Sequence, residues 1–207
     1  MSHFSLIRPE DDVAAQQASS WADAVAADWI AAGHQKSADI NQFSPPNHSQ
    51  IVSALASSVT LLCYFGHGDE RSWRTNAATT VTAPDFVPAQ AKAVVSIACK
   101  TGCILGPGAV TFGVAAWLGF TISVAVLSPH KGIDPIGDAI VAGLSGLRLG
   151  QTMQQCRDEL YAQLDSVVTD YDTGRYSSHP NAALKYFAAL AMRDHIVLHG
   201  TTHFAPL

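Results

Sequence analysis

The amino-acid sequence predicts an α/β fold in three layers, with a mostly parallel sheet covered by helices on both faces. Short apolar runs, among them residues 60–65 and 93–97, alternate along the chain with segments of helical periodicity. Both runs are apolar at nearly every position, as strands buried on both faces require. A length of 207 residues with 48% hydrophobic and 14% charged residues is enough for one core, so we expect a single domain over residues 1–207.

The first elements follow from periodicity and from residues that stop helices. Residues 4–7 form a short apolar run that predicts a strand, and residues 9–12 form a turn into a helix. The apolar residues of this helix recur at helical spacing: Val13, Trp21, Val25, Trp29 and Ile30. Gly33 ends the helix, and the polar segment 35–47 with its two prolines predicts a loop. A second helix over residues 48–57 then leads into the first of the two apolar runs.

The remaining elements continue the alternation. The polar segment 69–88 has no long apolar period and predicts a long loop, with a short edge strand or hairpin near residues 79–82. The later elements are expected in this order: a strand at 93–97, a helix at 108–118, a strand at 121–127, helical segments from 135 to about 168 with a break near 143–150, a helix at 182–192 and a strand at 195–200.

The charges and the cysteines limit the partners and the compartment. The net charge is -5 and the 12 Lys and Arg residues are scattered, so the chain lacks the basic cluster that a nucleic-acid partner needs. The N-terminal residues lack the basic and apolar regions of a secretory signal. The four cysteines lie mainly in apolar segments, which predicts free thiols in the cytoplasm: Cys63, Cys99, Cys103 and Cys156.

One apolar run reaches the minimum length of a membrane span. Residues 110–127 contain no charged side chain over eighteen positions. The alternative is a buried helix and a buried strand, because Gly119 breaks the helical period and the residues after it favour a strand. We expect the buried arrangement and no membrane partner.

Two residues with reactive side chains each follow a predicted strand. His67 stands between two glycines after residues 60–65, and Cys99 follows residues 93–97. Ligands of parallel sheets bind outside the carboxyl ends of the strands. If the two strands are neighbours, their spacing of about 4.8 Å brings the imidazole and the thiol to one place on that edge.

A cysteine beside a histidine supports nucleophilic catalysis. The thiolate attacks a carbonyl carbon, and the imidazolium protonates the departing amine. Gly66 and Gly68 permit backbone conformations closed to other residues and let a substrate chain come close. The backbone amides of Gly68 and Cys99 are candidates to face the developing oxyanion.

These residues also carry a resemblance to a known family. The stretches "YFGHG" and "VVSIACKTG" resemble the paired motifs of the caspase-like cysteine peptidases (clan CD), most closely the CHAT-domain branch. "GAVTFGVAAWLGFTISVAVLSP" and "NAALKYFAALAMRDHIVLHG" are similar to later segments of that family, so the resemblance covers roughly residues 49–200. It implies a caspase-like fold and a cysteine endopeptidase in which Cys99 is the nucleophile, His67 the general acid and the Gly68 amide part of the oxyanion hole.

The resemblance further implies that Asp11 or Asp12 lies near the primary specificity pocket. A carboxylate there suits an Arg or Lys side chain of the substrate. Alternatively, "PEDD" is a solvated helix start favoured by the helix dipole. Many CHAT proteins carry helical repeats, which this sequence lacks, so a protein substrate and a separate recognition or activating protein are the expected partners, with no cofactor.

Other function classes stay open at this point. Cys63, His67, Cys99 and Cys103 offer four ligands for a zinc-binding module, although structural zinc sites usually show tighter Cys-x-x-Cys spacing. A catalytically silent caspase-like domain that acts as an interaction or scaffold module is the second alternative. A thiol hydrolase of small esters is disfavoured, because "SIACKTG" lacks the first glycine of a nucleophile elbow.

Overall fold

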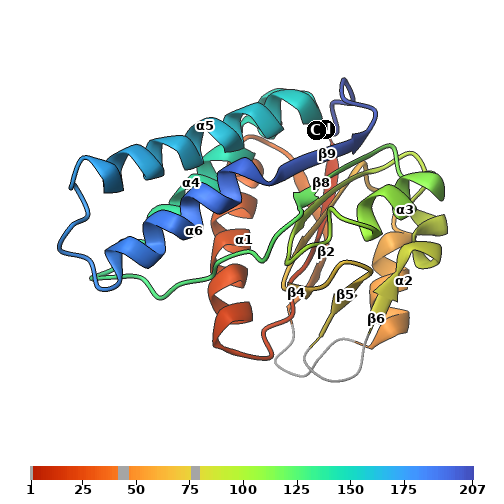
Figure 1. Ribbon diagram of the computed structural model, residues 1–207. Helices are drawn as coiled ribbons and strands as arrows, with labels where there is room; N and C mark the ends of the chain where they lie inside the picture. The colour runs from red at the N-terminus through yellow and green to blue at the C-terminus, as the bar shows by residue number, and fades with distance from the viewer. Residues whose placement is uncertain (1, 42–46, 76–79) are drawn as a thin grey trace.

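The computed structural model describes residues 2–41, 47–75 and 80–207, and its centre is a six-stranded sheet (Figure 1). The strands lie in the order β2-β1-β3-β7-β8-β9. Their bounds are β1 His3–Ile7, β2 Gln35–Ile40, β3 Leu61–Phe65, β7 Ala93–Ile97, β8 Ala116–Phe120 and β9 Ile196–Gly200. Five strands run parallel and β9 runs antiparallel to β8, which confirms the predicted α/β class with a mostly parallel sheet.

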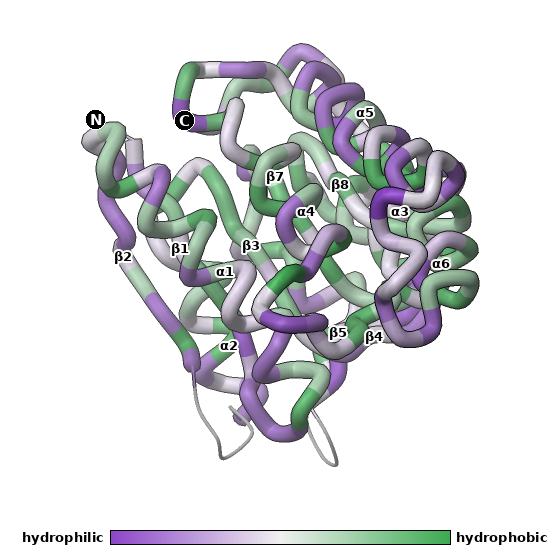
Figure 2. Tube along the Cα trace, turned by 90° about the vertical axis from the view of Figure 1, so that its left-hand side faces the viewer, coloured by the Kyte–Doolittle hydropathy of each residue, from purple (hydrophilic) through white to green (hydrophobic). Residues whose placement is uncertain are grey.

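Helices cover both faces of this sheet, as the sequence predicts (Figure 1). One face carries α1 Val13–Ala31, α4 Pro135–Ser145, the short helix η2 Gly146–Leu149, α5 Met153–Asp172 and α6 Ala182–Asp194. The other face carries α2 His48–Leu55, the short helix η1 Ala83–Ala89 and α3 Leu105–Thr111. Figure 2 shows that the chain around β3, β7 and β8 is largely hydrophobic, whereas much of the edge strand β2 is hydrophilic.

The central strands are apolar at nearly every position because each buries both of its faces. Along β3, Leu61, Cys63 and Phe65 pack on the side of α1, whereas Leu62 and Tyr64 pack on the side of α2 and α3. All five side chains are buried. Successive side chains of a strand point to opposite faces. In a strand between two helical layers both faces are buried, so polar and apolar residues do not alternate along it.

Three predicted elements are wrong, in two stretches of the chain. The strand expected at 121–127 is instead β8 at Ala116–Phe120, and the preceding helix α3 stops at Thr111, not at 118. Gly113, with φ +102°, turns the chain between them. The whole stretch is apolar, so hydrophobicity alone did not mark where the helix ended and the strand began.

The second wrong stretch is the polar segment after α1, which was predicted to be a loop. Residues Gln35–Ile40 form the edge strand β2, not a loop, and pair with β1. An edge strand next to solvent can be polar, and charged residues there keep other chains from pairing. The rest of this predicted loop includes residues 42–46, which lie outside the described residues.

A small second sheet lies at the carboxyl edge of the large one. Strands β4 His67–Gly68, β5 Ser72–Arg74 and β6 Thr80–Thr82 pair antiparallel in the order β4-β5-β6. The edge strand expected near residues 79–82 is therefore present as β6, although residues 76–79 lie outside the described residues. Among the helices of the described residues, none has the length and hydropathy that crossing a bilayer requires.

Candidate active site

The sheet topology brings the two predicted reactive residues together. Strands β3 and β7 pair directly and in parallel, and Phe65 lies opposite Ile97 at their carboxyl ends. His67 and Cys99 each lie two residues beyond this last pair. Both line one cavity of about 170 Å³, and both side chains are half-buried.

Cys99 stands on a tight turn that buried polar groups hold in place. Lys100 adopts φ +56°, a left-handed conformation that few non-glycine residues take. Below it, the Thr101 hydroxyl lies 2.9 Å from the Ser96 hydroxyl and donates to the Ala98 carbonyl at 3.3 Å. The Trp73 indole donates to the same Ser96 hydroxyl at 2.9 Å. This chain of bonds fixes the direction in which the Cys99 side chain leaves the sheet.

His67 is held by a carboxylate from the start of α1. Its Nε2 lies 2.8 Å from Oδ2 of Asp12, and the other oxygen of Asp12 accepts from the Ala15 amide at 2.8 Å and caps α1. Burial alone would raise the pKa of Asp12, but the bonds from Ala15 and His67 outweigh it and lower that pKa. The Asp12 carboxylate therefore stays charged and orients the imidazole ring.

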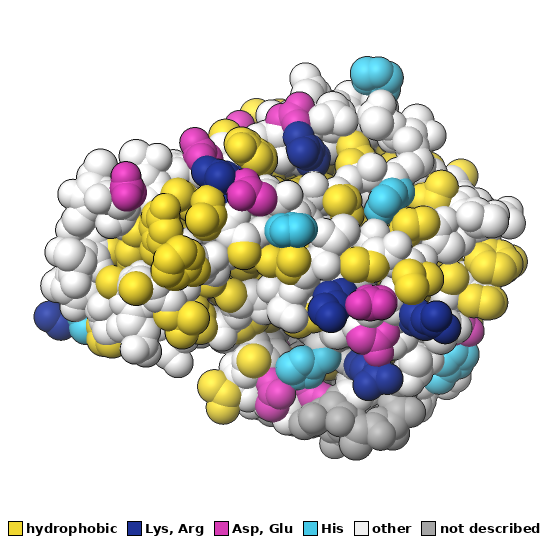
Figure 3. Space-filling model, in the orientation of Figure 1, with side chains coloured by type: hydrophobic (Ala, Val, Ile, Leu, Met, Phe, Trp, Pro, Cys, Tyr) yellow, Lys and Arg dark blue, Asp and Glu magenta, His cyan; other side chains and the backbone are white. Residues whose placement is uncertain are grey.

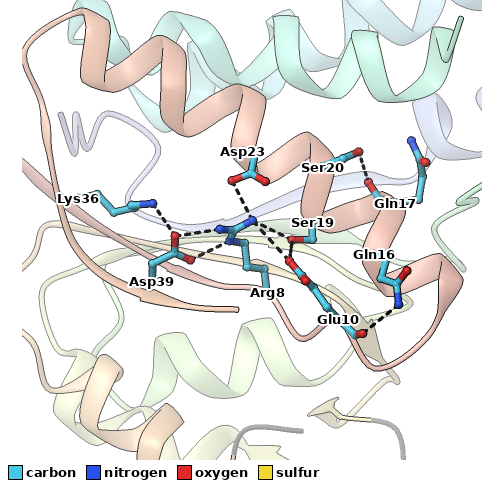
Figure 4. A network of polar contacts seen from close by, with 9 residues as sticks. All are labelled: Arg8, Glu10, Gln16, Gln17, Ser19, Ser20, Asp23, Lys36 and Asp39. Carbon is cyan, nitrogen blue, oxygen red and sulfur yellow. Dashed lines mark hydrogen bonds and ion pairs between the residues drawn. The ribbon is translucent and has the colours of Figure 1, made fainter. Parts of the chain in front are cut away.

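A buried arginine anchors the loop that carries Asp12 (Figure 4). Arg8 is only 4% exposed, and its guanidinium binds Asp39 of β2 through two contacts of 2.7 and 2.9 Å. The same group reaches Asp23 at 2.8 Å and Ser19 at 2.9 Å on α1. Glu10 accepts from Ser19 at 2.6 Å. The loop between β1 and α1 is thus fixed from both of its ends.

The two glycines beside His67 are required for space. Neither has a positive φ, so the predicted need for an unusual backbone conformation is not met. A Cβ on Gly68 would lie 2.7 Å from the Thr101 methyl carbon and 3.1 Å from the Cys99 carbonyl oxygen. A Cβ on Gly66 would lie 2.9 Å from the Tyr64 hydroxyl. The chain around His67 therefore passes close against the Cys99 turn.

The other three thiols differ from Cys99 in surroundings. Cys63 and Cys156 are fully buried, and burial raises the pKa of both, that of Cys156 to about 12. Burial, followed by the charge of Glu70, raises the pKa of Cys103, whose Sγ donates to the Thr121 carbonyl at 3.3 Å. These three thiols are consequently poor nucleophiles near neutral pH.

The predicted zinc tetrad does not assemble. Cys63 packs in the core beside α1, and Cys63, His67, Cys99 and Cys103 do not form a group of metal ligands among the described residues. In that part of the chain, Asp11, Asp12 and His67 are the only group of three or more such residues whose ligand atoms all lie within 4.8 Å of one another. Two of those three already bind each other through the His67–Asp12 contact.

Sequence reasoning placed Asp12 near the site but did not identify its partner. The only local signal was an acidic residue directly before a helix, which indicates a cap. Its contact with His67 joins residues that are 55 positions apart. Likewise, nothing in the sequence connected Trp73 of the polar loop with Ser96 of β7, which bond beneath the Cys99 turn.

Comparison with solved structures shows the fold. The chain matches the pro- and mature-domain complex of RgpB from Porphyromonas gingivalis with a TM-score of 0.63 at 13% identity, over 99% of this chain and 48% of that one. It matches the Arg-specific cysteine proteinase gingipain R (RgpB) with a TM-score of 0.63 at 12% identity, over 99% and 47% of the two chains. A third match, titled only as a protease, has a TM-score of 0.60 at 13% identity over 98% and 48%.

These matches confirm the caspase-like α/β sandwich. The chain spans about half the length of each solved chain. No protein-family model and no curated protein sequence matches it. The CHAT branch therefore stays a prediction.

Proposed function

We propose that this chain is a cysteine endopeptidase with Cys99 as nucleophile and His67 as general acid. One observation carries the proposal: both residues line the same cavity at the carboxyl edge of the sheet, and a charged carboxylate orients the imidazole. Activation of a nucleophile requires a base close to it and a third group that orients the base. The thiol, the imidazole and the carboxylate can fill these three roles. The fold shared with solved cysteine proteinases supports the same assignment.

The proposed reaction has two steps, acylation of the thiol and hydrolysis of the thioester. The Cys99 thiolate attacks the carbonyl carbon of the scissile peptide bond, and the amine leaves with a proton from the His67 imidazolium, which forms a thioester. His67, now neutral, takes a proton from water, whose oxygen attacks the thioester and releases the acid. Since Nε2 of His67 is bound to Asp12, Nδ1 is the ring nitrogen that exchanges the proton.

The backbone amides of Gly68 and Cys99 are the proposed oxyanion donors. Within the described residues, the Cys99 amide donates to no backbone carbonyl, which leaves it available for a substrate oxygen. Gly68 lies against the Cys99 carbonyl, so its main chain borders the same space. Fixed donors at this point stabilise the charge that develops on the carbonyl oxygen.

A protein substrate, brought by a separate recognition or activating protein, remains part of the proposal. The chain is half the length of the solved structures it matches, and one of those is a complex of pro- and mature domains. Cleavage after Arg or Lys stays a prediction from Asp11 and Asp12, and one solved neighbour is an Arg-specific proteinase. Asp12, however, is engaged with His67 and the start of α1, so it offers little to a basic side chain.

Incubation with a positional peptide library, with and without proteins encoded beside this one, tests the proposal. We expect cleavage that Cys99→Ala and His67→Ala both abolish while the circular dichroism spectrum stays that of the parent. Cleavage that survives in both variants would contradict the mechanism. A silent interaction module, the alternative, predicts no cleavage by any variant and stable binding of a partner that is indifferent to Cys99→Ala.

A further inference from the structure

Apart from His67 and Cys99, the cavity beside Cys99 has apolar walls. One wall is the start of α1, and the opposite wall is the chain that follows β8. The aliphatic lining residues are Ala14, Ala15, Ala18, Ile97, Val124 and Val126. Among all the lining residues, only His67 and Cys99 have polar side chains, and none has a carboxylate.

We propose that this cavity binds the side chain of the substrate residue whose carbonyl Cys99 attacks, and that it selects an uncharged aliphatic chain such as Leu or Met over Arg or Lys. The inference rests on the proposed peptidase function. It adds the class of substrate residue and differs from the preference for basic residues that the sequence suggests.

The position of the cavity determines which substrate residue enters it. Cys99 and His67 are themselves part of the wall, so a side chain inside lies directly beside the attacking sulfur. The Cys99 Sγ is 3.9 Å from the carbonyl oxygen of Val124, another lining residue. A residue whose carbonyl carbon is in reach of that sulfur has its own side chain, and not that of a distant neighbour, at the mouth of the cavity.

The size of the cavity fits a medium-sized aliphatic side chain. Its volume is about 170 Å³. Apolar protein cavities of roughly 150 Å³ hold a benzene molecule. The three alanines on α1 make this space, because larger side chains at those positions would fill it. A Leu or Met side chain would therefore be enclosed on several sides and lose its contact with water.

A basic side chain would find no partner in the cavity. Transfer of a cation away from water is unfavourable unless a carboxylate or several acceptors replace the water. Asp11 and Asp12 lie close to His67, yet neither lines the cavity. The two oxygens of Asp12 already accept from the Ala15 amide and from His67. The lining thus favours uncharged side chains, because it offers no carboxylate to a cation.

Peptidyl chloromethyl ketones that differ only in the residue next to the reactive group test this inference. The full chain is treated with the Leu, Met, Arg and Lys forms and with iodoacetamide, and alkylation is followed by intact mass. Cys99→Ala identifies the site of labelling. We expect the Leu and Met probes to label Cys99 about tenfold or more faster than the Arg and Lys probes, after division by the iodoacetamide rate.

Two variants add a carboxylate to opposite walls of the cavity. Ala14→Asp and Val126→Asp change half-buried residues, which tolerate a charge better than the fully buried Ala15 would. Each is expected to reduce the Leu-to-Arg ratio by about tenfold. Val13→Asp is the matched control, because Val13 neighbours Ala14 but is 77% exposed and does not line the cavity. It should leave the ratio unchanged.

The outcomes separate the two proposals. Faster labelling by the Leu and Met probes, shifted by the two wall variants and not by the control, supports the inference. Faster or equal labelling by the Arg probe overturns it and leaves the peptidase intact. If iodoacetamide modifies Cys99 but no peptidyl probe does, the proposed peptidase function fails and the inference falls with it.

Discussion

Two hollows lie beside the Cys99 turn, and they differ in charge. The cavity toward α1 measures about 170 Å³ and is lined by aliphatic residues, with His67 and Cys99 on its wall. The hollow over the small sheet measures about 390 Å³, begins at Lys100 and is lined by charged and hydroxyl side chains: Asp69, Glu70, Arg71, Ser72, Arg74, Thr80 and Thr82. Figure 3 shows charged side chains of both signs gathered over that sheet.

Four of the five charged side chains that line the larger hollow form ion pairs with one another. Arg74 binds Asp69 at 2.7 Å, and Lys100 lies 3.5 Å from Glu70. Each of these side chains is more than a third exposed, so water screens the pairs and their energies are small. From this difference we propose that charge does not mark the specificity site: the apolar cavity holds the proposed reactive groups, whereas the charged hollow is lined by exposed, screened ion pairs.

The largest expected effect compares the thiols on the two sides of the turn. Cys99→Ala should lower the rate of cleavage by about 10³-fold or more, because it removes the proposed nucleophile. Cys103→Ala, whose thiol bonds to the Thr121 carbonyl, should change it by less than about twofold. Initial rates on the best library peptide measure both. An equal loss of cleavage rate in Cys99→Ala and Cys103→Ala would contradict the assignment of Cys99 as the nucleophile.

Asp12 gives the next largest effect, since its carboxylate lies 2.8 Å from Nε2 of His67. Asp12→Asn keeps an oxygen for the Ala15 amide, and Asn is as good a helix cap as Asp. The imidazole loses its negatively charged partner, so we expect kcat to fall by about 10- to 100-fold, less than the roughly 10⁴-fold known for a buried triad aspartate. The free energy of unfolding should change by less than about 1 kcal/mol.

A second capping aspartate supplies the control for this variant. Asp134 caps α4 through the Gly137 amide and accepts from the Trp21 indole at 2.8 Å, and it does not line the cavity. Asp134→Asn should lower stability and leave kcat near that of the parent. An equal fall in kcat from both variants would mean that Asp12 acts through helix stability and not through His67.

The sequence predicted the positions of the two reactive residues better than the contacts that hold the surrounding loops. Two apolar runs, each followed by a reactive residue, predict two buried strands, and a buried strand has little freedom of register because every side chain must fit a core. The placement of His67 and Cys99 at the carboxyl ends of these strands was therefore predictable. The contacts of Arg8 with Asp39 and Asp23 were not, because they join three elements whose spacing only the packed structure sets.

Errors in the sequence prediction also have a common physical cause. The stretch 110–127 is uncharged and mostly apolar, so the boundary between α3 and β8 depends on Gly113 and on pairing with β7, not on hydrophobicity. The strand β2 is polar because it lies at the sheet edge, a position that the sequence does not reveal. The preference for basic residues was predicted from the charge of Asp11 and Asp12 and stays a prediction, whereas the proposed aliphatic pocket depends on three alanines of α1.

Acid should destabilise the protein in part through Asp12. Its pKa in the folded protein lies below the ordinary value of 3.8, because the bonds from Ala15 and His67 outweigh the effect of burial. The stabilisation it contributes is fully present above pH 3.8 and is lost as the pH falls through the lowered pKa. Urea unfolding between pH 5 and pH 2 should therefore show a smaller loss of stability for Asp12→Asn than for the parent. Identical slopes would mean that Asp12 is not held charged.

The smallest effect is expected from the charged hollow. Lys100→Gln removes one partner of an exposed pair with Glu70, and pairs of this kind contribute only about 0–1 kcal/mol. We expect KM to change by less than about threefold, with kcat unaltered, and the difference to disappear at about 1 M salt, where the Debye length is about 3 Å. If Lys100→Gln instead lowered kcat/KM as much as Asp12→Asn does, and this loss persisted at about 1 M salt, the specificity contacts would lie in the charged hollow. Only a desolvated cation that binds the substrate resists salt screening in this way.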